Sequence, residues 1–158
     1  MRAGLGYDVH PLVEGRELVL GGIQVPFSKG LSGHSDGDVL AHAIIDALLG
    51  AAGQGDIGTH FPSSDPAYSG ARSLDLLSQV ASLIARQGWQ IGNVDATIVA
   101  QEPKLSPFIQ QMARLLAQAL SLEPGRINVK ATTTDGLGFP GRGEGIAAYA
   151  IALIQERE

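Results

Sequence analysis

The stretch IAAYAIALI, residues 146–154, contains no charged side chain and does not alternate between apolar and polar residues. A strand with one face in water usually shows that alternation, whereas a strand covered on both faces does not. We therefore expect residues 146–154 to form a strand that is buried on both faces. Helices would cover one face of this strand, and a neighbouring subunit would cover the other.

Three further strands and three helices are expected from apolar periodicity and from turn residues. The strands are predicted at residues 2–10, 94–100 and 127–133, and the helices at residues 38–49, 71–87 and 106–120. Because strands and helices alternate in the second half of the chain, the pattern indicates a helix-backed sheet of α/β or α+β type.

Shorter features complete this expectation. Gly21-Gly22 lies between two short apolar runs, at residues 17–20 and 23–25, and is typical of a tight hairpin turn. Asp36 is expected to cap the helix at residues 38–49. Residues 53–70 are predicted to form a long polar loop, of the kind that often carries function.

Composition narrows the classes of function. The chain has 158 residues, no cysteine and a net charge of −5. Its length suits a single domain spanning residues 1–158. The charge argues against nucleic acid as a partner, and no apolar run is long enough for a membrane span. Because there is no cysteine, any metal ligands would be His, Asp or Glu. With no leader sequence evident, we expect a cytoplasmic protein.

Asp8, His10 and His42 form the first candidate site. Asp8 and His10 point to the same side of an extended strand, and the helix at residues 38–49 would bring His42 beside them. Two imidazoles and one carboxylate leave a fourth position open, as in catalytic zinc sites. On this helix Asp46 is expected to hold the other ring nitrogen of His42. The alternative is a surface Asp-His pair beside an ordinary core histidine.

Other segments suit a phosphorylated ligand. His34 and Ser35 precede a helix N-terminus, where free N–H groups favour anions. Lys104 follows the end of one predicted strand, and the run Thr132–Asp135 lies at the end of another. A threonine-rich strand edge is the plainer interpretation of that run. Arg142, with Glu144 nearby, either forms a surface ion pair or is held in place to bind an anion or seal a subunit interface.

Taken in order, these motifs resemble the 2-C-methyl-D-erythritol 2,4-cyclodiphosphate synthase family over essentially the whole chain. The resemblance is carried by Gly6-Tyr7-Asp8-Val9-His10, Gly33-His34-Ser35-Asp36-Gly37-Asp38 with His42, Asp46-Ala47-Leu48-Leu49-Gly50, Gly55-Asp56-Ile57-Gly58 with Phe61-Pro62, Gly92-Asn93-Val94-Asp95, Val129-Lys130-Ala131-Thr132-Thr133-Thr134 and Gly141-Arg142-Gly143-Glu144-Gly145.

The resemblance implies a fold and a reaction. Each subunit would contain a mixed four-stranded sheet backed by helices on one face, plus a small hairpin. Three subunits would form a homotrimer with active sites between neighbours. The reaction would cyclise 4-diphosphocytidyl-2-C-methyl-D-erythritol 2-phosphate and release CMP, in non-mevalonate isoprenoid biosynthesis. Nucleic acid and membrane would not be partners.

The resemblance also implies roles for residues at matching positions. Zinc would bind Asp8, His10 and His42, and Mg²⁺ or Mn²⁺ would accompany the substrate diphosphate, with Asp135 as ligand. His34 and Thr133 would be catalytic. Substrate-binding residues would be Asp8, His10, His34, Ser35, Asp56, Ile57, Gly58, Phe61, Ser63, Asp65, Ala100, Lys104, Leu105, Ser106, Thr132, Thr133, Thr134, Asp135, Phe139 and Arg142. The last two would line an axial cavity with room for an isoprenoid diphosphate.

Three positions depart from the family pattern. Asp135 replaces the usual glutamate, Ser63 replaces the usual aspartate, and Phe108 stands where histidine is often found. We expect activity to be retained despite these departures. Two rival functions remain open: a metal-dependent phosphohydrolase that uses the same triad to activate water, and a trimeric binding protein without catalysis.

Overall fold

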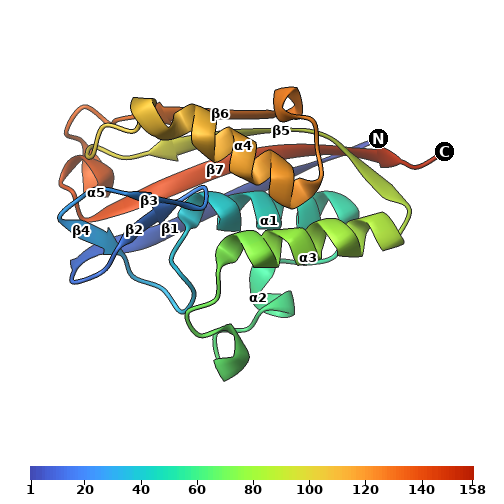
Figure 1. Ribbon diagram of the computed structural model, residues 1–158, viewed down its shortest axis with the longest axis horizontal. Helices are drawn as coiled ribbons and strands as arrows, with labels where there is room; N and C mark the ends of the chain where they lie inside the picture. Colours follow the sequence, from blue (N-terminus) through green and yellow to red (C-terminus); the bar gives the residue numbers. More distant parts are fainter.

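The computed structural model describes residues 1–158 and contains a curved five-stranded sheet (Figure 1). Its strands are β4 (Lys29–Leu31), β1 (Arg2–Glu14), β7 (Gly145–Glu156), β5 (Trp89–Val99) and β6 (Ile127–Thr132), in that order across the sheet. Strand β7, which contains the apolar run, is central and pairs antiparallel with β1 and β5. Strands β5 and β6 are parallel, so the sheet is mixed, as predicted.

The predicted sheet lacked one strand. Strand β4 lies in a segment for which no strand was predicted, and it pairs with the end of β1. Three residues are too few to show apolar alternation, so no sequence signal indicated it. Strand β1 also extends beyond its predicted end at His10, which gives β4 its partner.

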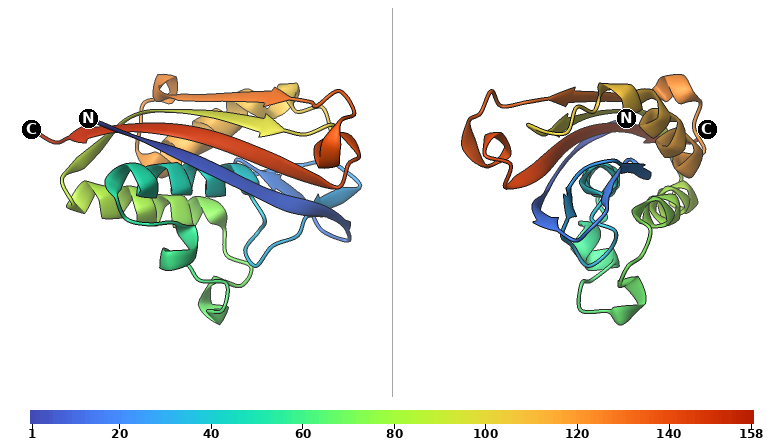
Figure 2. Two further views of the ribbon diagram at one scale, coloured as in Figure 1. Left: turned by 180° about the vertical axis from the view of Figure 1, so that it is seen from behind. Right: turned by 60° about the vertical axis from the view of Figure 1, so that its left-hand side comes forward.

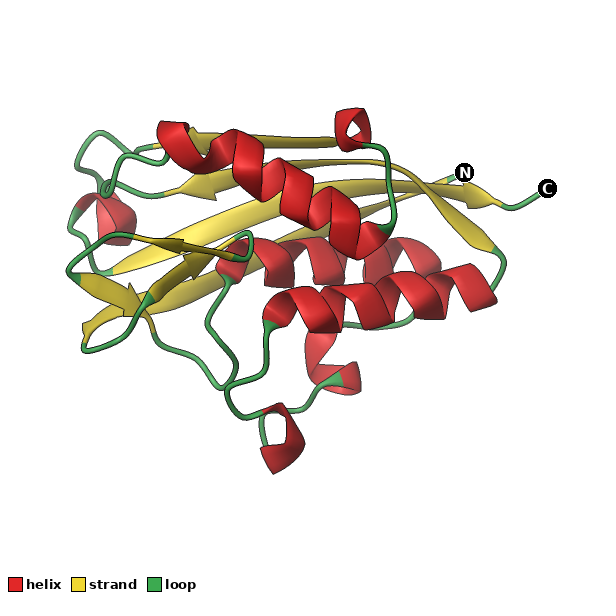
Figure 3. Cartoon of the chain, in the orientation of Figure 1, coloured by secondary structure: helices red, strands yellow, loops and turns green.

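Helices cover one face of the sheet, in agreement with the prediction (Figures 2 and 3). Helix α1 (Val39–Ala52) packs on β1 and β7, helix α3 (Ser73–Arg86) packs beside α1, and helix α4 (Ile109–Leu120) packs on β6. The shorter helical segments are α2 (Ile57–His60), α5 (Gly138–Gly141) and three 3₁₀ turns at Pro66–Tyr68, Ser106–Phe108 and Pro124–Arg126. No helix has the length and apolar character required to cross a membrane.

The second face of the sheet carries exposed apolar side chains in the single chain. Tyr149 and Ile151 of β7 are 48% and 55% exposed. Leu5, Tyr7 and Val9 of β1 are exposed on the same face, and the rings of Tyr7 and Tyr149 lie 4.8 Å apart between centroids. Helices therefore account for one half of the predicted burial of β7, and cover by a neighbouring subunit stays a prediction.

A buried carboxylate joins the hairpin to helix α1. The hairpin strands β2 (Leu18–Leu20) and β3 (Ile23–Val25) confirm the predicted turn. Asp38 accepts hydrogen bonds from Gly21 N and Gly22 N, and it caps α1 by accepting from Ala41 N. The prediction that Asp36 caps this helix was therefore wrong. Burial, followed by the charge of Asp36, raises the pKa of Asp38.

Two glycines bring helix α1 against strand β1. A Cβ atom added at Gly4 would lie 1.9 Å from Ala47 O, and one added at Gly6 would lie 1.8 Å from Ala43 O. The helix backbone thus occupies the space that side chains at these positions would need. This close approach places the first turns of α1 beside the next residues of β1 that face inward, Asp8 and His10.

Candidate metal centre and active site

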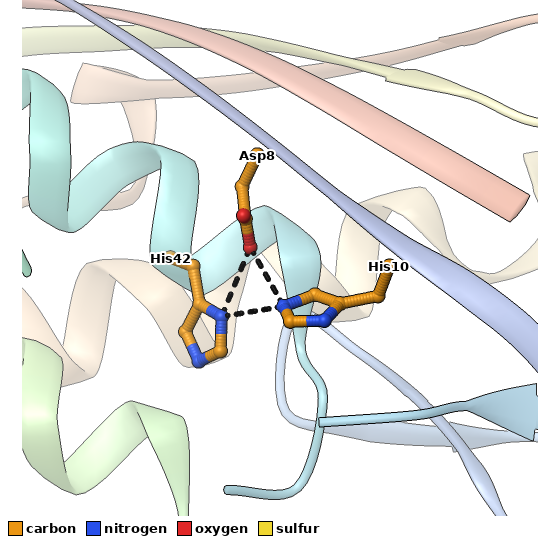
Figure 4. A group of neighbouring side chains, drawn as sticks. All are labelled: Asp8, His10 and His42. Atoms are coloured by element: carbon orange, nitrogen blue, oxygen red, sulfur yellow. Dashed lines mark hydrogen bonds and ion pairs between the residues drawn. The ribbon is translucent and has the colours of Figure 1, made fainter. Parts of the chain in front are cut away.

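Asp8, His10 and His42 meet at one point, as the sequence predicted (Figure 4). Asp8 Oδ2 lies 2.9 Å from His10 Nε2 and 3.0 Å from His42 Nδ1, and the two nitrogens are 3.2 Å apart. One carboxylate oxygen and two imidazole nitrogens are the donor types that zinc accepts, and three protein ligands are typical of its catalytic sites. The geometry therefore fits a metal ion.

Local structure explains why these three side chains converge. Strand alternation sends Asp8 and His10 to the face covered by α1, and sends Tyr7 and Val9 to the opposite face. His42 lies in the first turn of α1 after its cap, and its side chain is 91% buried. Close packing of helix against strand sets the distance between the two elements.

The second nitrogen of His42 contacts serine hydroxyls. Nε2 lies 2.8 Å from Ser73 Oγ and 3.0 Å from Ser35 Oγ. The prediction that Asp46 would hold this nitrogen was wrong. Asp46 instead accepts a hydrogen bond from Ile57 N at 2.7 Å and thereby anchors the start of α2. Ser73 was missed by the sequence analysis, because nothing in its local pattern indicates a contact with a histidine 31 residues away.

A cavity of about 220 Å³ opens beside the triad. It brings together several of the predicted substrate-binding residues with two that were not predicted, Tyr68 and Leu76. Its lining is Asp8, His10, His34, Ser35, His42, Ile57, Gly58, Phe61, Ser63, Tyr68 and Leu76. Aromatic contact between Phe61 and Tyr68, with centroids 5.3 Å apart, helps to form one wall.

Two predicted substrate-binding aspartates have other contacts here. The Asp65 carboxylate accepts from Ala67 N, while its backbone oxygen lies 2.9 Å from His34 Nε2. The Asp56 carboxylate caps α2, accepting from Thr59 N and Thr59 Oγ1, and the side-chain bond is the main cause of its lowered pKa. Their roles in substrate binding stay predictions.

The remaining predicted substrate residues do not line this cavity within one chain. Lys104, Ser106, Thr132, Thr133 and Asp135 are exposed. Thr133 Oγ1 donates to Asp135 Oδ1 at 3.3 Å, so these two side chains contact each other at the end of β6. By contrast Ala100 and Leu105 are buried, and Ala100 N donates to Thr132 O at 2.9 Å. The binding roles of this whole group stay predictions.

Arg142 and Glu144 of the glycine-rich loop form an exposed ion pair, the plainer of the two alternatives that the sequence left open. Arg142 Nε donates to Glu144 Oε1 at 2.7 Å, and a second guanidinium nitrogen lies 3.3 Å from Oε2. This pairing raises the pKa of Arg142 and lowers that of Glu144. Phe139 lines a separate cavity of about 450 Å³ together with Tyr7 and Tyr149. An axial site for an isoprenoid diphosphate at these residues stays a prediction.

Contacts within the triad shift the pKa values of Asp8 and His10. Burial would raise the pKa of Asp8, but hydrogen bonds and charge interactions with His10 and His42 outweigh it and lower this pKa to about 2. The pKa of His10 is raised, first by its hydrogen bond to Asp8. The metal-free site therefore favours an ionised carboxylate beside a protonated imidazole.

These shifts predict how the stability of the metal-free protein depends on pH. The Asp8 contribution is present above the unfolded pKa of about 3.9 and is lost as pH falls towards the lowered value. The His10 contribution is complete below about pH 6.5 and is lost as pH rises through the raised pKa. Urea midpoints of chelator-treated protein should therefore be higher near pH 5.5 than near pH 8.5, by a margin that shrinks in His10→Asn. An equal margin in this variant would contradict the prediction.

Comparison with known proteins places the chain in a family. The model of the YgbB family matches residues 1–155. The 2-C-methyl-D-erythritol 2,4-cyclodiphosphate synthase of Pelotomaculum thermopropionicum is 62% identical over 99% of this chain and 96% of that protein. The synthase of Geotalea daltonii is 64% identical over 99% of this chain and 92% of that protein.

Solved structures agree with the sequence comparisons. The bifunctional IspDF from Campylobacter jejuni matches with a TM-score of 0.96 and 45% identity, covering 99% of this chain and 42% of that chain. A 2C-methyl-D-erythritol-2,4-cyclodiphosphate synthase described as a CDP-bound form matches with a TM-score of 0.89 and 36% identity, over 98% of this chain and 100% of that chain. From its triad, its fold and its relatives alike, the chain belongs to the YgbB family of 2-C-methyl-D-erythritol 2,4-cyclodiphosphate synthases.

Proposed function

We propose that this chain converts 4-diphosphocytidyl-2-C-methyl-D-erythritol 2-phosphate into 2-C-methyl-D-erythritol 2,4-cyclodiphosphate and CMP. An oxygen of the 2-phosphate attacks the β-phosphorus of the diphosphate and forms a new P–O–P linkage. The bond between the β-phosphorus and the bridging oxygen breaks, and CMP leaves with that oxygen. The observation that carries this proposal is the convergence of Asp8, His10 and His42 beside a cavity in a chain of this family.

The residues around the cavity could position the phosphate groups of the substrate and neutralise their charge. Asp8, His10 and His42 fit zinc, which when bound would supply a Lewis acid for a phosphate oxygen. Because the net charge is −5, a polyphosphate substrate needs such local positive charge. His34 and Ser35 line the cavity and offer polar groups to a phosphate, while Ile57 and Phe61 exclude water from one side.

The nucleotide half of the site is proposed to come from a neighbouring subunit. Thr132–Asp135 and the segment 100–106 lie outside the triad cavity of the same chain. A homotrimer with its active sites between subunits would bring the two halves together. In that assembly Asp135 would bind Mg²⁺ or Mn²⁺ with the substrate diphosphate. The exposed apolar face of β1 and β7 supports association, because such patches on monomers are usually small. A cytoplasmic location stays a prediction from the sequence.

Ile151→Glu is expected to break this association. Ile151 is 55% exposed in the single chain and lies opposite Asp95 of β5. A carboxylate at position 151 that a partner buries would therefore be desolvated beside a like charge. We expect wild type to sediment as a trimer and Ile151→Glu as a monomer with little turnover. Gln111→Glu, which adds the same charge at an exposed position of α4, serves as the control. A trimer of unchanged stability in Ile151→Glu would place the interface elsewhere.

Product analysis tests the reaction itself. Purified protein is incubated with 4-diphosphocytidyl-2-C-methyl-D-erythritol 2-phosphate and Mg²⁺, and the products are identified by ³¹P NMR. A cyclic diphosphate formed together with equimolar CMP supports the proposal. A linear phosphate product would instead support the phosphohydrolase, and no turnover at all would support the binding protein.

A further inference from the structure

The hydroxyl of Ser73 lies between a carboxylate and a ligand of the metal site. Ser73 Oγ is 2.5 Å from Asp36 Oδ1 and 2.8 Å from His42 Nε2. The backbone N–H of Ser73 donates to the other oxygen of the same carboxylate at 3.0 Å. Ser73 is fully buried and does not line the cavity, so it is not placed to touch substrate.

The direction of these hydrogen bonds follows from the groups involved. A carboxylate only accepts, so Ser73 donates its single hydroxyl proton to Asp36. The lone pairs of Ser73 Oγ then remain for a donor. His42 Nε2 is the ring nitrogen within reach, and it can fill this role only when it carries a proton.

The tautomer of His42 decides whether it can bind a metal through Nδ1. A neutral imidazole has one N–H, and only its bare nitrogen is a ligand. Asp8 Oδ2, 3.0 Å from Nδ1, draws the proton to the metal-facing side of the ring. Ser73, with its own proton committed to Asp36, draws it to the opposite side.

We propose that Ser73, oriented by Asp36, is a positioning residue that accepts the Nε2 proton of His42 and leaves Nδ1 bare for the metal. The inference rests on the metal site proposed above. It adds the residue that selects the His42 tautomer with its proton on Nε2. Ser35 does not replace Ser73 in this role. Its hydroxyl lies 3.0 Å from Nε2 and 3.3 Å from Ser73 Oγ, but no carboxylate accepts its proton, so nothing forces Ser35 to act as an acceptor toward His42.

Zinc affinity tests the proposal in the metal-free protein. Competition with a chromophoric chelator gives the dissociation constant for wild type and for Ser73→Ala. We expect the variant to bind zinc about 10- to 100-fold more weakly, the usual loss when a partner of a ligating histidine is removed. Ser73→Thr, which keeps a hydroxyl, should recover most of the affinity. The matched control is Ser82→Ala on the same helix, whose exposed hydroxyl bonds only to Ser78 O.

A second measurement uses the wild-type protein, so it does not require that a variant folds. In zinc-loaded wild type, ¹⁵N NMR should show a His42 ring proton on Nε2 that exchanges slowly with water, because a buried acceptor holds it. In Ser73→Ala that signal should broaden by exchange.

The outcomes separate the inference from the metal site itself. Equal zinc affinity in wild type and Ser73→Ala would overturn the role of Ser73 while leaving the site intact. A rapidly exchanging Nε2 proton in wild type would also overturn it. Failure of the wild type to bind zinc would overturn the metal site on which the inference rests.

Discussion

Replacing His42 by alanine is expected to abolish tight zinc binding and to lower turnover by about 10³-fold or more. A metal acting as Lewis acid contributes several kcal/mol to the transition state, and each ~1.4 kcal/mol is a factor of ten in rate. His42 supplies one of only three donor atoms at the site, so its loss leaves a pair of ligands exposed to water. Metal content by elemental analysis and single-turnover rates measure the two effects.

The fold should survive this substitution. Alanine is the best helix former, and the neighbours of His42 along α1 include Ala41 and Ala43. His60→Ala is the matched control, because His60 contacts Gln54 O and does not line the triad cavity. It should retain wild-type zinc content. Full metal content in His42→Ala, with turnover unchanged, would show that the triad is not the metal site.

Replacing Gly6 by alanine is expected to prevent stable folding. The added Cβ would lie 1.8 Å from Ala43 O and 2.8 Å from Ala43 C, so helix α1 would have to lift away from β1. Overpacking against backbone cannot be relieved by a side-chain rotamer. We expect the free energy of unfolding to fall by more than about 4 kcal/mol, a large part of the ~5–15 kcal/mol that a domain has.

Gly50→Ala provides the matched control for this prediction. Gly50 lies on α1, the helix against which Gly6 packs, and a Cβ atom at position 50 would have no heavy atom within 4 Å. Alanine at an exposed helical position should stabilise the protein by about 0.5–1 kcal/mol. Urea unfolding followed by circular dichroism compares the two variants. An unfolding midpoint for Gly6→Ala equal to that of wild type would show that helix and strand are less tightly apposed than described.

The metal ligands could be predicted from the sequence, but the residue that contacts His42 behind the site could not. Asp8 and His10 share one face because strand alternation is a local rule, and the helix expected at residues 38–49 brought His42 beside them, as the resemblance also implied. Ser73 as partner of His42 was not predictable in the same way. Its contact with His42 depends on how α3 packs against α1, and no local pattern encodes that packing.

Helix caps show the same limit at short range. Asp36 and Asp38 are two residues apart, and both are favourable N-cap residues. The structure assigns the cap to Asp38, because the hairpin turn at Gly21-Gly22 presents two further N–H donors to that carboxylate. Asp36 is thereby left to bind Ser73. A distant turn therefore decided between two equivalent local choices.

Periodicity and composition in the sequence alone determined the helices, the main strands, the cover of β7 by helices on one face and the pairing of Asp8 with His10. These features depend on neighbours along the chain, where 3.6-residue and two-residue repeats set which side chains share a face. The tertiary structure alone decided the fifth strand, the cap of α1, the serine partner of His42 and the exposure of one sheet face. Each of these depends on contacts between segments far apart in sequence, whose geometry is set by the packing of whole elements.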